Sequence, residues 1–185
     1  MNNPLRILTA LDAHLTKPSR IVVYGRSALA LGYLEGDKFA VTMDVDGILP
    51  ETEMAAIEAD EQFWAAVDIT NRELESSGLY ITHLFSDHQV ILRPDWLDHV
   101  VSISCGLTKL SIFRPHVLDL ILTKMMREDP QDLADICFLL DREAVSRNDL
   151  IGAFDQARVP AIEEIRIAFA ANQQRVLDLP GFVRV

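Results

Sequence analysis

The region from Ile21 to Ile48 limits the fold most, because it joins two β-favouring runs through a glycine turn and a helix-forming segment. Residues 21–24 (IVVY) form a short apolar run that stops at Gly25. A helix is predicted from about 27 to 35, so Gly25 supplies a sharp strand-to-helix turn. Backbone N–H groups at such a helix start are a natural binding place for a phosphate.

The second strand is predicted near residues 40–46 and ends in Asp44-Val45-Asp46. Because side chains alternate along a strand, Asp44 and Asp46 share one face while Val45 points into a core. The two carboxylates repel each other, and a hard divalent cation such as Mg²⁺ removes that repulsion. The alternative is that the acids only end a strand at the solvent edge, since Asp-x-Asp is a common pattern.

Composition excludes several classes of protein. Of 185 residues, 49% are hydrophobic, which is enough for a core, but no segment approaches the roughly 18 uninterrupted apolar residues of a membrane span. The N-terminal residues do not read as a signal peptide. A net charge of −11 argues against tight, non-specific binding to nucleic acids. It does not exclude a local basic patch or a nucleotide held through a metal.

Neither the cysteines nor the histidines form a recognisable zinc motif. Cys105 and Cys137 have no suitably spaced partners and are too few for a disulfide framework, so we expect buried thiols in a reducing cytoplasm. The spacing of His83, Asp87 and His88 matches no zinc motif either.

The order of the predicted elements indicates an α+β fold. Strands are expected near residues 20–24, 40–46 and 79–85, with a hairpin of 100–104 and 107–113. Helices are expected over 3–15, in a long and interrupted pattern over 50–76, over 115–126, from Pro130, from Asn148, and from Pro160 to about 177. We therefore expect residues 1–115 to form an α/β core and residues 116–185 to pack on it as a helical part of a single compact unit.

Two blocks of residues resemble a known family. Gly25-x-Ser27 followed by Thr42-x-Asp44-x-Asp46 is similar to the signature of the nucleotidyltransferase (polymerase β-like) superfamily. A second block, with Lys124, Arg127 and then Asp132-x-x-Asp135, resembles a segment of the abortive-infection, type IV toxin group and its uncharacterised relatives. Together the blocks cover about the central two thirds of the chain.

The resemblance implies a mixed β-sheet flanked by helices, and the Mg²⁺-dependent (or Mn²⁺-dependent) transfer of a nucleotidyl group from an NTP. In this interpretation Asp44 and Asp46 hold the metal, and Lys124 neutralises developing charge. The residues assigned to nucleotide binding are Gly25, Arg26, Ser27, Thr42, Arg127, Asp132 and Asp135. Each member of the second block also has a structural interpretation: a lysine at a helix end, and acids in the first turns of a helix, both complement the helix dipole.

The chain departs from the family pattern at the third metal-binding acid, which usually comes from the next strand. The corresponding strand, Tyr80 to Leu84, contains no acid, so Asp87 in the following turn is the candidate third ligand. Two functions therefore stay open. One is a nucleotidyltransferase that modifies a protein, a small molecule or a tRNA end, in a toxin–antitoxin or phage-defence setting with an antitoxin-like partner. The other is a catalytically silent nucleotidyltransferase-like binding or regulatory module.

Overall fold

The contacts of the chain divide it into two units. The structure, a computed structural model, describes residues 2–33, 39 and 41–182. Unit 1 comprises Met1–Ser86 and Val100–Arg114, and unit 2 comprises Asp87–His99 and Pro115–Val185. The segment 87–99, which follows the third strand, thus groups with the helical unit.

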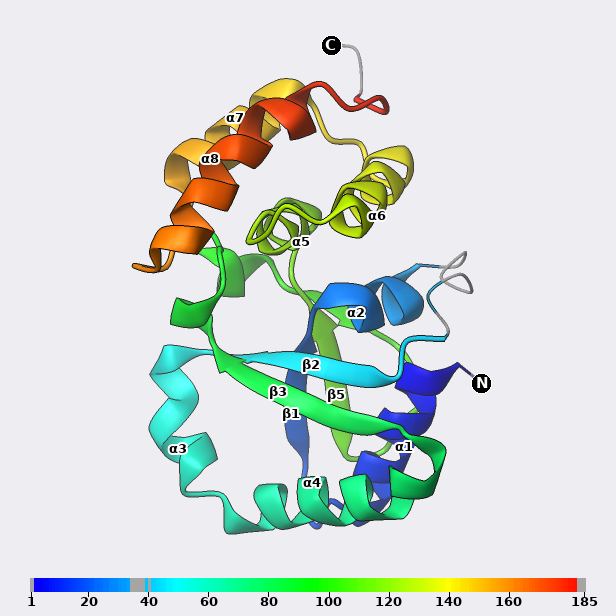
Figure 1. The fold of residues 1–185 in the computed structure, drawn as a ribbon. Coiled ribbons are helices and arrows are strands. Elements are labelled where there is room, and N and C mark those ends of the chain that lie inside the picture. The colour runs from blue at the N-terminus through cyan, green and yellow to red at the C-terminus, as the bar shows by residue number, and fades with distance from the viewer. Residues whose placement is uncertain (1, 34–38, 40, 183–185) are drawn as a thin grey trace. The chain divides into compact units, whose positions relative to one another are not determined.

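Unit 1 contains a five-stranded mixed sheet (Figure 1). Its strands are β1 (Ser19–Val23), β2 (Asp44–Leu49), β3 (Tyr80–Ser86), β4 (Val101–Ile103) and β5 (Leu110–Arg114), in the order β3-β2-β1-β5-β4. The pairs β1–β5 and β2–β3 are parallel, whereas β1–β2 and β4–β5 are antiparallel. The predicted mixed sheet and the predicted hairpin of β4 and β5 are confirmed.

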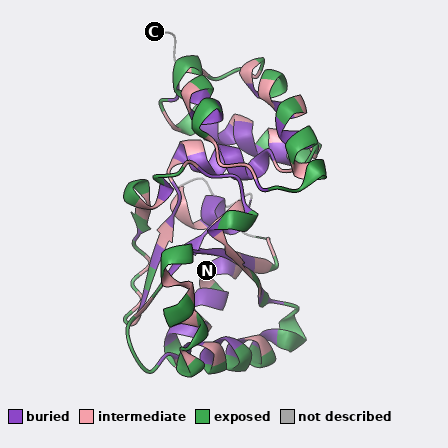
Figure 2. Ribbon diagram, turned by 90° about the vertical axis from the view of Figure 1, so that its left-hand side faces the viewer, coloured by how far each residue is buried: buried purple, intermediate pink, exposed green. Residues whose placement is uncertain are grey.

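Helices cover both faces of this sheet. They are α1 (Asn3–His14), α2 (Gly25–Gly32), α3 (Met54–Glu58) and α4 (Glu61–Leu74), with short 3₁₀ turns η2 (Glu51–Glu53) and η3 (Glu75–Ser77). Helices α1 and α4 pack together on one face, and α2 lies on the other (Figure 1). Buried and exposed residues alternate along α4, as expected for a helix with one apolar side (Figure 2). The long helical pattern over 50–76 is interrupted, as predicted.

Strand β2 is displaced from its prediction. It was expected to end at Asp46, but it begins at Asp44 and continues to Leu49. The reason is pairing with both neighbouring strands. On β3, Tyr80 pairs with Asp44 and Ser86 with Leu49, which sets the two ends of β2, while Val22 and Val23 of β1 pair with Ile48 and Gly47. Helix α2 also begins earlier than expected, at Gly25, and its expected end near residue 35 lies outside the described residues.

Asp12 fixes α1 to the segment that leads into β5. Its carboxylate accepts hydrogen bonds from the backbone N–H groups of Lys109 and Leu110, both at 2.7 Å, and from the N–H and hydroxyl groups of Thr108. Burial alone would raise the pKa of Asp12, but these hydrogen bonds outweigh it and hold the pKa below its ordinary value.

Unit 2 is mostly helical. It contains α5 (Val117–Lys124), α6 (Pro130–Arg142), α7 (Arg147–Gln156) and α8 (Glu163–Leu177), and the turns η4 (Asp87–Gln89) and η5 (Trp96–His99). The predicted start of α6 is confirmed, since Pro130 opens the helix and the Asp129 side chain caps it by accepting from Gln131 N–H. Among the described residues, no helix is long and apolar enough to cross a membrane.

Helix α5 is the buried centre of unit 2. Its residues from Leu120 to Lys124 are all buried. Asp119 is fully buried and is paired with Arg93, whose guanidinium donates to both carboxylate oxygens. The pairing explains how a charged group is accommodated in this core.

Candidate functional site

Asp44 and Asp46 lie on one face of β2, as the alternation of a strand predicts. Both are half-buried, whereas Val45 between them is fully buried. Thr42 Oγ1 donates to Asp44 Oδ1 over 3.3 Å, and Thr82 Oγ1 donates to Asp46 Oδ1 over 2.7 Å. The two carboxylates are thus held by hydroxyl groups.

In the described part of the chain, no lysine or arginine compensates the charge of this acidic pair. Within residues 2–33, 39 and 41–182, neither acid forms an ion pair with a lysine or arginine, and the nearest basic group is His83, with Nδ1 3.6 Å from Asp46 Oδ1. Burial raises the pKa of Asp46, and the neighbouring Asp44 charge acts in the same direction. Two such carboxylates are suitable ligands for a hard divalent cation.

A β-bulge on β3 lies opposite Asp46. Val45 pairs with Ile81 but Gly47 pairs with Leu84, so Thr82 and His83 together face a single residue of β2. The sequence of β3 contains no acid, and a hydroxyl and an imidazole stand next to Asp46. Sequence alternation gave no signal for these two contacts, because a bulge depends on pairing with the neighbouring strand.

Asn71 of α4 secures this bulged strand. Its side-chain amide donates to the Ile81 carbonyl over 3.1 Å and accepts from the Ile81 N–H over 2.7 Å. β3 is the last strand of the described sheet, so Asn71 occupies backbone groups that an edge strand would otherwise leave open.

The Gly25 turn lies beside Asp46. Gly25 has φ +62°, and a Cβ atom at this position would be 3.9 Å from Asp46 Oδ2. Tyr24 N–H donates to the Asp46 carbonyl over 3.2 Å, which fixes the turn to β2. Tyr24, the N-cap residue of α2, makes no capping hydrogen bond with its side chain.

The other residues of the first block have defined partners. Ser27 is buried, and its hydroxyl donates to the Tyr24 carbonyl over 2.8 Å. The guanidinium of Arg26 lies over the Phe39 ring, 5.2 Å from its centroid. The Ser27 hydroxyl therefore stabilises the turn.

The second block forms a compact charged cluster in unit 2. Lys124 is only 7% exposed, and its Nζ lies 3.0 Å from Asp132 Oδ1 and 2.6 Å from Asp135 Oδ2. Arg127 Nε donates to Asp132 Oδ2 over 2.6 Å, while its side chain is 69% exposed. The structure thus brings together all four predicted residues of this block and directs the Lys124 ammonium at two buried carboxylates.

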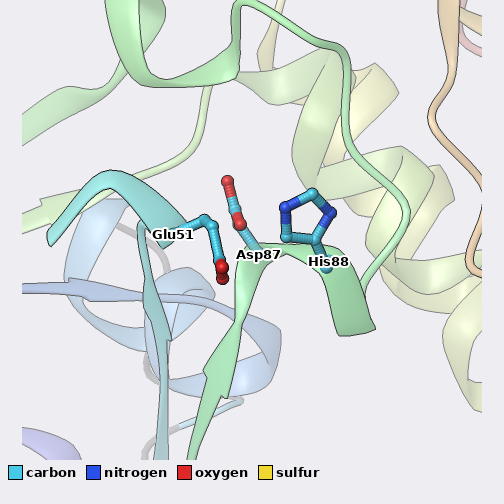
Figure 3. Close-up of side chains that lie close together, drawn as sticks. All are labelled: Glu51, Asp87 and His88. Carbon is cyan, nitrogen blue, oxygen red and sulfur yellow. The ribbon is translucent and has the colours of Figure 1, made fainter. Parts of the chain in front are cut away.

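Asp87, the candidate third metal ligand, lies in η4 of unit 2 next to His88 (Figure 3). Its carboxylate is buried, accepts from Trp96 Nε1 over 3.0 Å and pairs with Arg158 over 3.1 Å. Its partners within unit 2 therefore account for the burial of this acid. Glu51 of unit 1, also drawn in Figure 3, accepts from the Ser86 hydroxyl at the end of β3.

A cavity of about 220 Å³ lies at the end of β2 opposite Asp44. It is lined by Leu49, Phe63 and two ion pairs, Lys17–Asp60 and Arg20–Glu53. Its basic side chains are paired with acids of the same cavity, and neither Asp44 nor Asp46 lines it.

Comparison with known proteins identifies the family. The model of a family described as a nucleotidyltransferase of unknown function (DUF6036) matches residues 5–147, more than half of the chain and a span that includes both blocks. Neither the curated proteins nor the solved structures contain a significant match. The chain belongs to this nucleotidyltransferase family of unknown function.

Proposed function

We propose that this protein is a Mg²⁺-dependent nucleotidyltransferase, also able to use Mn²⁺, that moves a nucleotidyl group from an NTP to an acceptor. One observation carries the proposal: Asp44 and Asp46 share a face of β2 beside the Gly25 turn, and among the described residues no lysine or arginine pairs with them. Family membership supports it.

The donor set fits a hard cation. Mg²⁺ prefers one or two carboxylates together with waters and substrate phosphate oxygens, and Asp44 and Asp46 supply the carboxylates. A cation held by these two carboxylates would supply Lewis-acid stabilisation of the charge that develops on the transferred phosphoryl group. Thr42 and Thr82 orient the two carboxylates through their hydroxyl groups.

The turn at Gly25 binds phosphate in this proposal. The start of α2 offers backbone N–H groups that the Tyr24 side chain does not cap, and the helix dipole favours an anion there. In unit 2, Arg127 presents an exposed guanidinium that Asp132 orients. Lys124 remains a predicted charge-neutralising residue, and its position is set by Asp132 and Asp135.

We further propose a protein or small-molecule acceptor over a tRNA end, since the chain carries a net charge of −11. We also propose a toxin–antitoxin or phage-defence setting with an antitoxin-like partner, which the resemblance of the second block supports, and a location in the cytoplasm, which two cysteines without a disulfide support. A second candidate function is a catalytically silent binding module. It is favoured by one observation, namely that a hydroxyl and an imidazole, rather than an acid, lie beside Asp46 on β3.

The test is isothermal titration of each NTP, with and without Mg²⁺, into the wild-type protein and Asp44→Asn. Asp68→Asn is the matched control, because Asp68 is an exposed acid of α4. We expect Mg²⁺-dependent binding by the wild type and by the control that is lost in Asp44→Asn. Pyrophosphate release then separates the enzyme from the silent module. If no NTP binds in either condition, the proposal is wrong.

A further inference from the structure

Aromatic rings line the face of β3 that carries the candidate site. Tyr80 is paired in register with Asp44, so its side chain lies on the same face of the sheet. His83 and Phe85 follow along the strand, and their rings are stacked with centroids 5.0 Å apart and planes inclined by 19°. Tyr24, directly before the glycine turn, meets Phe85 edge-on at 6.1 Å.

The β-bulge explains why His83 belongs to this row. In a regular strand, His83 would point to the same face as Ile81, towards the core under α4. The additional residue in β3 reverses this orientation and brings His83 Nδ1 within 3.6 Å of Asp46 Oδ1. Asn71 holds Ile81 and so fixes the point where the bulge begins.

These rings are accessible. Tyr80 is 41% exposed and the His83 side chain is 63% exposed, while Phe85 beneath it is half-buried. A stacked pair with such an open outer ring contributes little to core packing. It offers a flat π-surface directly beside two carboxylates.

We infer that His83 and Phe85, flanked by Tyr80, form a platform on which an unpaired nucleobase stacks while its phosphates lie towards Asp44 and Asp46. The inference rests on the proposed function, which places phosphates at these acids. Stacking on a ring tolerates every base, because every base has a π-face, so little base preference is expected. The base belongs either to the donor NTP or to a single-stranded acceptor.

The test compares ligands with and without a base. Mg²⁺ titrations use the four NTPs, inorganic tripolyphosphate and a short single-stranded oligonucleotide, against wild type, His83→Leu and His83→Phe. We expect tripolyphosphate to bind all three proteins equally. His83→Leu should lose roughly tenfold in affinity for the base-containing ligand, and His83→Phe, which keeps a ring, should retain it. Phe85→Leu, which removes the lower ring, provides a second variant with the same expected loss.

Each outcome decides between alternatives. If His83→Leu and Phe85→Leu lose affinity only for NTPs, the stacked base belongs to the donor. If they lose affinity only for the oligonucleotide, it belongs to the acceptor. Unchanged affinities in His83→Leu and Phe85→Leu overturn the platform. An equal loss in His83→Leu and His83→Phe also overturns it, because a ring nitrogen rather than the ring face is then required. If the wild type binds neither tripolyphosphate nor NTPs, the proposed function is contradicted. The affinities of the wild type and the variants for the oligonucleotide then decide whether the platform exists.

Discussion

Two pairs of aspartates, both assigned to the site by resemblance, have opposite surroundings. Asp132 and Asp135 of α6 are buried and are neutralised by Lys124 and by Arg127. Asp44 and Asp46 of β2 are half-buried, accept from hydroxyl groups, and form no ion pair with a lysine or arginine of the described chain.

This difference separates acids whose interactions stabilise the fold from acids whose charges destabilise it. A buried carboxylate without a partner is strongly destabilising, so the Lys124 cluster is explained by the stability of unit 2. The repulsion between Asp44 and Asp46, and the raised pKa of Asp46, are instead a cost to folding. Arrangements that folding disfavours are candidates for function, which is why the proposals rest on β2 rather than on α6.

The largest effect is expected from Lys124→Met. The substitution leaves Asp132 and Asp135 buried and without the ammonium, so the free energy of unfolding should fall by about 3–5 kcal/mol. Urea denaturation followed by circular dichroism measures it.

The matched control replaces the whole cluster core, combining Lys124→Met with Asp132→Leu and Asp135→Leu. Apolar replacements of a complete buried network are often neutral or stabilising, so most of the lost stability should return. A wild-type stability for Lys124→Met alone would show that unit 2 does not depend on this cation, and the contrast between the two acid pairs would disappear.

Asp12→Asn extends the comparison to a buried acid that is satisfied by N–H groups instead of cations. It weakens charge-assisted hydrogen bonds to residues 108–110 and should cost about 2 kcal/mol at pH 7. The folded-state pKa of Asp12 is depressed, so this stability is fully present well above the ordinary pKa of 3.8. This stabilisation is lost as the pH falls through 3.8 towards the pKa of Asp12 in the folded state.

Thermal unfolding of wild type and Asp12→Asn at pH 7 and at pH 3 measures the effect. The difference in melting temperature should shrink at the lower pH. A difference that is equally large at both pH values would mean that the charge of Asp12 does not contribute.

The sequence predicted elements whose signals are local. Asp129 and Pro130 marked the start of α6, and the alternation of Asp44, Val45 and Asp46 predicted which side chains share a face. Features that depend on a partner segment were not predictable. The start of β2 at Asp44 follows from pairing with β3, and the bulge that brings His83 to Asp46 follows from the register of β3 with β2.

The same limit applies to Lys124. Helical spacing predicted that Asp132 and Asp135 share a face, and the resemblance suggested that they orient Lys124 or Arg127. The burial of Lys124 depends on how α5 packs in unit 2, which no local pattern specifies.

Asp46→Asn tests the other side of the comparison. Because burial raises the folded-state pKa of Asp46, the ionised carboxylate destabilises the fold once the pH exceeds the unfolded value of 3.8. The variant should therefore be as stable as wild type, or more stable by on the order of 0.5 kcal/mol, at pH 7. This small gain should vanish below pH 3.8. Urea denaturation at both pH values measures it, and a clear loss of stability would place Asp46 among the acids that the fold requires.

The smallest effect on stability is expected from Arg127→Gln, which sharpens the comparison within the second cluster. The Arg127 side chain is 69% exposed, and an exposed ion pair contributes about 0–1 kcal/mol, while Asp132 keeps its bond to Lys124. A variant with nearly wild-type urea stability but weaker NTP binding would assign Arg127 to the nucleotide and Lys124 to the fold. If Arg127→Gln instead destabilised the protein as strongly as Lys124→Met, the four residues would act as one structural network, and the candidate site would be confined to β2, β3 and the Gly25 turn.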